Sequence, residues 1–335
     1  MKKTYYLFNP GTISRKDNTL KFTPVDEEGK ELKSKYLPIE AVEQLFVFGE
    51  LKMNSPLMNF LGQKGIPIHF FGYYENYTGS FMPKDQLLSG KMLLAQCRYH
   101  ENHKKRIVIA RKFIEGAYFN MMKTVKYYQN RGEDGLLDVL DEMEKWSKKI
   151  DKTENIEELM GIEGNIRNAY YKSFSLIIKD FEFSSRNRQP PKDEVNVLIS
   201  FGNMMCYTAC LTEIFHTQMN PTISFLHSPG ERRYSLALDI AEIFKPILVD
   251  RVIFKVLNKR MISAKDFDAK TKGIRLKDKG KKAFIQAYQE RLEETIKHRN
   301  LKRHVSYKRL VRLECHKLAK HLLGDKEYEP FKIWW

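Results

Sequence analysis

Two carboxylates three residues apart, Asp239 and Glu242, are the most constrained feature of the sequence that could do chemistry. Around them, apolar residues recur at every fourth position, at Leu236, Ile240 and Phe244. This spacing predicts a helix with both acids on one face. Adjacent carboxylates repel unless a cation or proton lies between them, and their oxygens are ligands that Mg²⁺ and Mn²⁺ prefer. The pair therefore predicts a metal site, against the ordinary alternative of a solvated helix face.

Two further side chains could complete such a site. His227 follows an apolar run and precedes a Pro-Gly turn signal, which places the imidazole at the mouth of the next helix. Glu163 is flanked by two glycines, whose small size lets another backbone or a ligand approach closely. The ordinary alternatives are a structural histidine and a glutamate paired with Arg167 at the fourth position after it.

Cations follow two of these acids within one helical turn, Arg167 after Glu163 and Lys245 after Glu242. Each could clamp a phosphate, or each could simply pair with its acid, and the spacing favours neither. A divalent ion held here would stabilise charge on a transferring phosphoryl group and activate an oxygen nucleophile. The residues therefore indicate metal-assisted phosphodiester chemistry.

The elements that must position these residues fall into two parts. Residues 1–83 contain short β-rich runs broken by turn signals, with one short helix near 55–63. Beyond them, apolar residues recur with helical period over 87–129, 133–149, 157–178, 193–217, 235–258 and 279–296. The sequence predicts an α+β protein, with a β-rich domain of residues 1–83 and an all-α domain of residues 87–335. Pro83-Lys84-Asp85 is the expected joint, and 184–191 is an expected loop.

Positive charge is concentrated after the carboxylate stretch. The chain has 335 residues and a net charge of +16, and its 42% apolar content can build a substantial core. Residues 251–335 hold 24 Lys and Arg against 10 Asp and Glu. Basicity alone does not distinguish nucleic acid from an acidic membrane, but its place beside the acids favours a phosphate-tracking surface. Unpaired bases could stack on tyrosines 170, 171, 234, 288 and 307.

Other features limit where the protein acts. No apolar run approaches the roughly 20 residues that span a bilayer, and the start lacks a signal-peptide core, so we expect a cytoplasmic protein without membrane contact. The four cysteines show no paired spacing, which is typical of a reducing compartment and argues against structural zinc. Cys97, His100 and His103 could supply three ligands, but the sequence shows no fourth.

Four motifs between about residues 160 and 250 share their order with one known family. They are Gly161-Ile162-Glu163-Gly164 with Arg167 and Tyr171; Arg188 with Pro190, Pro191, Asp193 and Asn196, running into Leu198-Ile199-Ser200-Phe201-Gly202; Phe225-Leu226-His227; and Ser235-Leu236-Ala237-Leu238-Asp239 with Glu242-Ile243-Phe244-Lys245-Pro246. With them the chain closely resembles the CRISPR-associated integrase family, the universal nuclease of spacer acquisition. The β-rich start and helical end are similar to the family's layout.

The resemblance implies that Glu163, His227 and Glu242 hold the metal, with Asp239 as a nearby second acid that orients a water or holds a second ion. Many members carry aspartate where Glu242 stands, and glutamate remains a competent oxygen ligand. It also implies an endonuclease and integrase that captures short DNA duplexes with single-stranded ends. These are inserted as new spacers into a CRISPR repeat array by transesterification. The implied assembly is a homodimer joined through the N-terminal domains, with a second small CRISPR-associated adaptation protein.

Two other kinds of function are compatible with the same residues. In a non-catalytic, basic DNA-binding architectural protein the acids would be structural, and replacing Glu163 or His227 would cost no function beyond stability. A metal-dependent phosphohydrolase of small substrates is the other, but so basic a C-terminal region far exceeds what a small phosphate ester needs.

Overall fold

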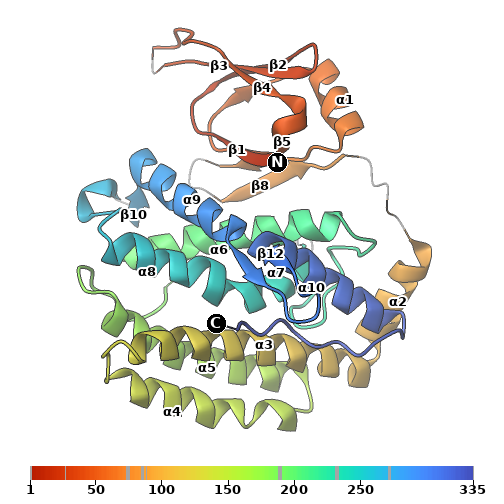
Figure 1. Cartoon of the computed structure of the whole chain (residues 1–335), viewed down its shortest axis with the longest axis vertical. Helices are drawn as coiled ribbons and strands as arrows, with labels where there is room; N and C mark the ends of the chain where they lie inside the picture. Colours follow the sequence, from red (N-terminus) through yellow and green to blue (C-terminus); the bar gives the residue numbers. More distant parts are fainter. Residues whose placement is uncertain are drawn as a thin grey trace. The chain divides into compact units, whose positions relative to one another are not determined.

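The structure, a computed structural model, describes residues 2–26, 28–72, 76–83, 87, 89–187, 191–230, 234–270 and 273–334. The chain divides into two compact units, Met1–Gln86 and Leu87–Trp335. The first is rich in strands and the second is mostly helical (Figure 1), which confirms the predicted α+β class. At the expected joint, Lys84 and Asp85 lie outside the described residues, as do Arg188 and Pro190 of the second motif.

The first unit contains two four-stranded sheets and one α-helix among its described residues. One sheet has the order β1-β5-β7-β8, and the other has the order β4-β3-β2-β6. The elements of this unit are β1 (Lys3–Leu7), β2 (Gly11–Lys16), β3 (Thr19–Pro24), β4 (Lys35–Pro38), the 3₁₀ turn Ile39–Ala41, β5 (Val42–Val47), β6 (Leu51–Lys52), α1 (Ser55–Lys64), β7 (Ile68–Phe71) and β8 (Tyr77–Phe81).

One apolar core joins both sheets and α1. Leu45 of β5 and Ile68 of β7 are paired in register and fully buried, and Ile13 of β2 belongs to the same cluster. The short helix predicted near residues 55–63 is confirmed. It begins where the Asn54 side chain accepts the Leu57 backbone N–H at 3.1 Å, and ends at a glycine with φ 66°.

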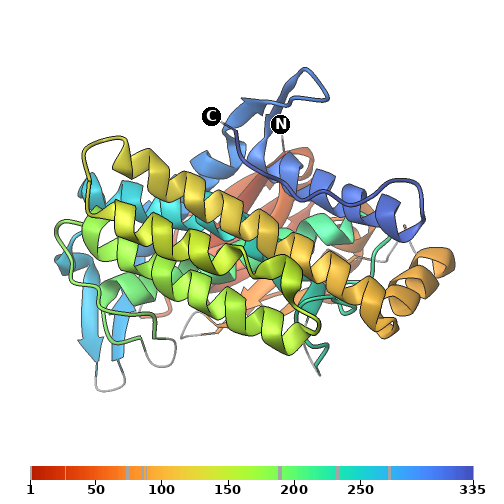
Figure 2. The ribbon, with the colours of Figure 1, turned by 90° about the horizontal axis from the view of Figure 1, so that it is seen from below.

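The second unit is built from nine α-helices and two hairpins among its described residues. They are α2 (Gly90–Glu101), α3 (His103–Gln129), α4 (Leu136–Ser147), the 3₁₀ turn Ile150–Lys152, α5 (Ile156–Ile177), α6 (Glu194–Phe215), α7 (Ser235–Lys245), the π-helical turn Pro246–Asp250, α8 (Arg251–Asn258), the 3₁₀ turn Ala264–Asp266, β9 (Phe267–Lys270), β10 (Gly273–Leu276), α9 (Asp278–Glu293), β11 (Thr295–Lys297), β12 (His304–Ser306) and α10 (Tyr307–Leu322). Helices α3, α4 and α5 pack side by side (Figure 2).

Two predicted helices are interrupted for identifiable reasons. The stretch 87–129 breaks at Asn102, whose backbone is extended and whose side chain accepts the Lys105 N–H at 3.0 Å, so it caps a new helix. The stretch 235–258 contains Pro246, which has no N–H to donate, and the backbone there widens into one π-helical turn. That turn directly follows the helix carrying Asp239 and Glu242.

The second domain is mostly helical, as expected, but it also contains two short hairpins. The hairpins β9–β10 and β11–β12 were not predicted, because each strand is only three or four residues long, too short to show an apolar alternation. Helix α10 was also not predicted from periodicity, although Leu310 and Leu318 of its buried face lie in the core.

Helix α6 is long and apolar enough to cross a membrane by length and composition, with a mean hydropathy of 1.3. Thus the expectation that no apolar run approaches that length is wrong for this helix. Of its most apolar window, 78% is buried inside the structure. The helix packs against α7, α8 and α10, so its apolar surface is covered by protein.

Candidate active site

One stripe of α5 faces a cavity. Met160, Glu163, Arg167 and Tyr171 follow each other at intervals of three or four residues, so they project from one side of the helix. The helix begins at Asn155, whose side chain accepts the Glu158 N–H at 2.8 Å. The capped start and the helical period together bring Glu163 and Arg167 to the same cavity wall.

Asp239 of α7 holds the segment that carries His227. Its carboxylate accepts the backbone N–H groups of Phe225, Leu226 and His227 at 2.7, 3.0 and 2.9 Å. The same carboxylate lies 2.8 Å from His227 Nδ1, and the Asp239 side chain is fully buried. The second ring nitrogen, Nε2, is therefore left for contacts with the cavity, and it lies 4.0 Å from Glu242 Oε1.

Glu242 faces the cavity one turn after Asp239 and is surrounded by cations. Lys245 Nζ lies 2.6 Å from its Oε1, and the Arg167 guanidinium pairs with its Oε2. The Arg167 guanidinium also pairs with Glu163. One buried guanidinium thus bridges the two predicted metal-ligating carboxylates. In this structure both Arg167 and Lys245 pair with acids, which is the alternative that the sequence left open.

These side chains line a single cavity of about 370 Å³. Glu163, His227 and Glu242 all contribute to its wall, together with Arg167 and Lys245. Asp239 does not line it and lies behind the imidazole. The structure therefore brings the three predicted ligands together across sequence separations of 64 and 15 residues.

Burial and the clustered charges shift several pKa values. Burial acts to raise the pKa of Glu163, but the Arg167 guanidinium outweighs it and the pKa is lowered. Burial, reinforced by the positive charge of Arg167, lowers the pKa of Lys245 to about 8. Burial raises the pKa of Asp250, at the end of the π-helical turn, to about 6, although Tyr170 donates a hydrogen bond to it at 2.9 Å. Burial therefore disfavours the charged forms of Lys245 and Asp250, whereas Arg167 favours the charged form of Glu163.

The donor set fits a hard divalent cation. It offers two carboxylates and an imidazole nitrogen, and the other nitrogen of that imidazole is held by a carboxylate, an arrangement common around metal-bound histidine. No three His, Cys, Asp or Glu side chains among the described residues are close enough to form a ready-made ligand cluster. The physical reason here is the Arg167 guanidinium, whose positive charge lies between Glu163 and Glu242.

The second set of possible metal ligands, Cys97, His100 and His103, makes other contacts. His100 Nδ1 lies 2.6 Å from the Ser224 carbonyl oxygen, and Cys97 and His103 form no metal-like cluster with it in the described part of the chain. Of the predicted stacking tyrosines, those at 170, 171, 288 and 307 are buried. Only Tyr171 lines the cavity.

Two polar cavity residues, Arg186 and Asn203, were not identified from the sequence, nor was the apolar Met160. Arg186 enters from the segment before α6, where it donates to Asn196 Oδ1 at 2.8 Å and to Ser200 Oγ at 2.9 Å. Asn203 lies on α6. A polar residue within a strongly apolar helix was the available signal for Asn203, whereas Arg186 belongs to a polar loop in which nothing marks it.

The geometry defines a class of protein: a smaller β-rich unit is followed in the chain by a helical unit with a buried acid-imidazole site lined by cations. The family model described as "CRISPR associated protein Cas1" matches residues 5–290. The chain belongs to this family, which confirms the resemblance drawn from the motifs.

Relatives match over essentially the full chain. A CRISPR-associated endonuclease Cas1 from Fusobacterium nucleatum is 46% identical, covering 100% of this chain and 98% of the relative. A CRISPR-associated protein Cas1 from Methanobrevibacter ruminantium is 48% identical, covering 100% and 99%. The solved structure of a CAS1 protein from Thermotoga maritima superposes with a TM-score of 0.86 at 39% identity, covering 98% and 99%. A casposase bound to integration product shares the fold, with a TM-score of 0.86 at 19% identity over 99% and 93%.

Proposed function

We propose that the chain is a metal-dependent DNA endonuclease and integrase that captures short DNA fragments and inserts them as new spacers into a CRISPR array by transesterification. The observation that carries this proposal is the convergence of Glu163, Glu242 and His227 Nε2 on one cavity, with Asp239 fixing the imidazole. The endonuclease names of full-length relatives support the reaction class.

Glu163, His227 and Glu242 would hold Mg²⁺ or Mn²⁺. When bound, such an ion supplies charge stabilisation at the phosphoryl group and activates an oxygen nucleophile. Asp239 contacts Nδ1 of the His227 imidazole, which keeps the ring oriented and leaves Nε2 facing the cavity. The cations Arg167 and Lys245 lie beside the acids. Once Glu163 and Glu242 bind a metal ion, these cations would be free to neutralise phosphate oxygens.

The partners follow from the same proposal. The substrate would be a DNA duplex with single-stranded ends, and the target the CRISPR repeat array, contacted through the basic residues of 251–335. We also propose a homodimer and a larger complex with a second small adaptation protein, acting in the cytoplasm without membrane contact. A solved structure described as a Cas6-RT-Cas1--Cas2 complex contains a chain with the same fold. It superposes on 100% of this chain and 36% of its own length, with a TM-score of 0.83 at 19% identity.

The test is a strand-integration and cleavage assay with and without divalent metal and partner protein. Glu163→Gln, His227→Ala and Glu242→Gln should each abolish both activities while most DNA affinity remains, because phosphate contacts supply that affinity. Glu157→Gln, on the exposed face of the same helix, is the matched control and should leave activity unchanged. Retained cleavage in any of the three purified site variants would contradict the assigned ligand set.

The same variants separate this proposal from the DNA-binding architectural protein. If the acids are only structural, Glu163→Gln should change thermal stability and leave every measured function otherwise intact. Hydrolysis of a small phosphate ester at rates that match DNA cleavage would favour the phosphohydrolase instead.

A further inference from the structure

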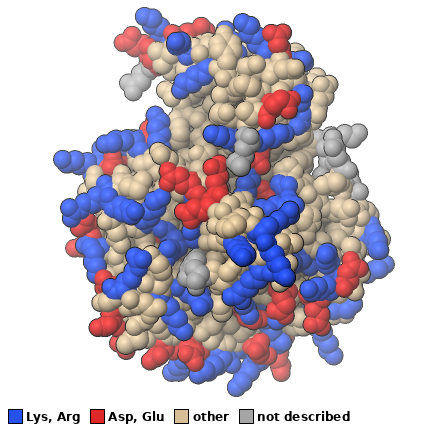
Figure 3. Space-filling view, viewed as in Figure 1, with Lys and Arg blue, Asp and Glu red and all other residues tan. Residues whose placement is uncertain are grey.

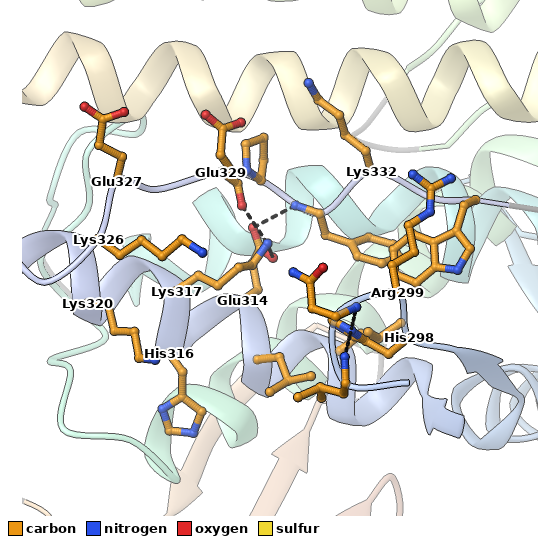
Figure 4. Close-up of a pocket in the computed structure, with 17 residues that line it drawn as sticks. His298, Arg299, Glu314, His316, Lys317, Lys320, Lys326, Glu327, Glu329 and Lys332 are labelled. Atoms are coloured by element: carbon orange, nitrogen blue, oxygen red, sulfur yellow. Dashed lines mark hydrogen bonds and ion pairs between the residues drawn. The ribbon is translucent and has the colours of Figure 1, made fainter. Parts of the chain in front are cut away.

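A second cavity, of about 520 Å³, lies near the C-terminus of the helical unit. Its wall is formed by the loop between β11 and β12, by α10, and by the segment 326–334 that follows α10 (Figure 4). Small-molecule sites have volumes of roughly 300–1,000 Å³. The cavity is therefore large enough for a ligand of nucleotide size.

Hydrogen bonds hold the cavity wall in place, and those to Glu314 are buried. The carboxylate of Glu314, on α10, accepts the Tyr328 hydroxyl at 2.6 Å and the Phe331 N–H at 3.0 Å. Lys317 Nζ lies 2.7 Å from the other Glu314 oxygen, so the charge of this carboxylate is balanced. The Trp334 indole N–H donates to the Lys297 carbonyl at 2.9 Å. The wall is thus formed before any ligand arrives, which lowers the entropic cost of binding.

This cavity is separate from the catalytic one. The ring of Phe331, part of its wall, stacks on Phe244 of α7 with centroids 5.4 Å apart. Phe244 follows Glu242 by two residues, and residues two apart project from nearly opposite sides of a helix. A ligand here therefore lies on the other side of α7 from the reacting phosphate.

The cavity combines an apolar floor with a cationic rim. Leu301, Leu310, Leu313, Pro330 and Phe331 supply apolar surface. Arg299, Lys317, Lys320, Lys326 and Lys332 line the same cavity, against the acids Glu314, Glu327 and Glu329. Glu314 pairs with Lys317 and Glu329 with Lys112, so the cations outnumber the acids in the wall. Figure 3 shows Lys and Arg gathered on the face that carries the β11–β12 hairpin and α10. Such a site complements a ligand with a flat apolar body and a negative end.

Two polar groups in the wall can read the edge of a flat heterocycle. The backbone N–H groups of Asn300 and Leu301 donate to His298 Nδ1, each at 3.2 Å, so the neutral ring carries its proton on Nε2 as a donor. The Asn300 amide adds both a donor and an acceptor, the pairing that asparagine offers to adenine. Arg299 lies over the Trp334 ring at 5.3 Å, a position from which it can also stack on a base.

We propose that this cavity is a second, non-catalytic site that binds a nucleoside monophosphate unit, with the base on the apolar floor and the phosphate at Arg299, Lys320 and Lys326. Free nucleotide and an unpaired nucleotide of a DNA strand share this chemistry. That the nucleotide belongs to a DNA strand rests on the proposed function. That the cavity binds a nucleotide does not. Aromatic and cationic groups side by side are the usual platform for unpaired nucleotides.

The test titrates the full chain with deoxyadenosine 5′-monophosphate in EDTA, so that no metal can hold phosphate at the catalytic site. Binding is followed by tryptophan fluorescence, with Trp334→Phe assigning the signal. The double variant Lys320→Glu and Lys326→Glu should weaken binding by at least about tenfold, since hydrogen bonds to charged groups are strong. Lys145→Glu, an exposed lysine on α4, is the matched control and should change affinity by less than about twofold.

Two competitors distinguish the sources: a single-stranded pentanucleotide and a blunt duplex. Displacement of the mononucleotide by the pentanucleotide but not by the duplex supports an unpaired DNA nucleotide, and displacement by neither supports a free nucleotide. No mononucleotide binding at millimolar concentration, or equal weakening by Lys145→Glu, overturns the site. Because this readout involves no cleavage, its failure leaves the proposed endonuclease function untouched, and loss of that function leaves this binding result intact.

Discussion

A single carboxylate, that of Asp239, connects the His227 imidazole to the backbone. Asp239 accepts three consecutive backbone N–H groups as well as the contact with His227 Nδ1, so its two oxygens have no lone pair directed at the cavity. Glu242, one turn later, has its oxygens in the cavity wall. The two acids that looked equivalent in the sequence therefore occupy different environments, and we expect different roles.

Asp239→Asn should lower turnover by about 10- to 100-fold while leaving most metal affinity. The asparagine amide would place an N–H donor against backbone N–H groups that now donate to the carboxylate, and the imidazole would be held less firmly. Calorimetry with Mn²⁺ and a cleavage assay on the same preparation measure the two quantities. Metal binding that disappears in Asp239→Asn yet survives in Glu242→Gln would reverse the assignment.

At this scale the sequence predicted which residues meet but not how they pair. Helical spacing and the family motifs were enough to place Glu163, His227 and Glu242 around one cavity. The bridging position of Arg167 depends on the distance between α5 and α7, which no local pattern encodes. The contribution of Arg186 depends likewise on the path of an irregular segment.

One buried amide ties three segments together at the scale of elements. Asn120 of α3 donates to the Ile243 carbonyl of α7 at 2.9 Å and to the Phe331 carbonyl at 3.1 Å, and its oxygen accepts the Ile333 N–H at 2.8 Å. The side chain is fully buried. Since these hydrogen bonds are buried, losing the amide leaves several backbone groups unsatisfied.

Asn120→Ala should lower the free energy of unfolding by about 2 to 4 kcal/mol, through unsatisfied backbone groups and a small cavity. Urea unfolding followed by circular dichroism measures the change. Asn165→Ala, which removes one solvent-exposed bond to the Gly161 carbonyl, is the matched control and should be close to neutral. Equal effects of the two substitutions would show that the three-way connection contributes little.

The buried acid at the end of the π-helical turn makes stability depend on pH. Burial raises the pKa of Asp250 to about 6 in the folded state, so folding favours its protonated form. The stability that protonation provides is present below the unfolded pKa, near 4, and is lost as pH rises through about 6.

Asp250→Asn removes this titration while keeping an acceptor for the Tyr170 hydroxyl. Between pH 4 and pH 8 the stability of the variant should therefore improve relative to the parent by on the order of 3 kcal/mol. Thermal and urea unfolding at both pH values, in EDTA, give the difference. Exposed Asp151→Asn serves as a control for removing a carboxylate. A pH-independent difference for Asp250→Asn would contradict the shifted pKa.

In the helical unit, sequence reasoning located several long helices but missed helix α10 and the two short hairpins. Periodicity located α4, α5 and α6 to within a few residues because each presents several turns of apolar residues to a core. The hairpins β9–β10 and β11–β12 have too few residues for a pattern. The break at Asn102 is a capping effect of one side chain, which periodicity averages away.

At the scale of the whole molecule, one sheet of the first unit ends in a strand with exposed apolar side chains. Strand β4 ends the order β4-β3-β2-β6, so one side of it has no strand neighbour among the described residues. Tyr36 on this strand is 50% exposed, and Leu32 just before it is 44% exposed. An exposed edge with apolar side chains favours association with another chain.

We expect a homodimer that uses this edge. The proposed integration reaction would join two strand ends at separated phosphates, and a dimer would supply two such sites at a fixed spacing. Light scattering at micromolar concentration should give a dimer for the full-length chain and a weakened dimer for Leu32→Glu with Tyr36→Glu. Lys33→Glu, an exposed neighbour with a similar change toward negative charge, should remain dimeric. A monomeric parent protein would contradict the paired-site mechanism, whereas a dimer unaffected by the double substitution would place the interface elsewhere on the chain.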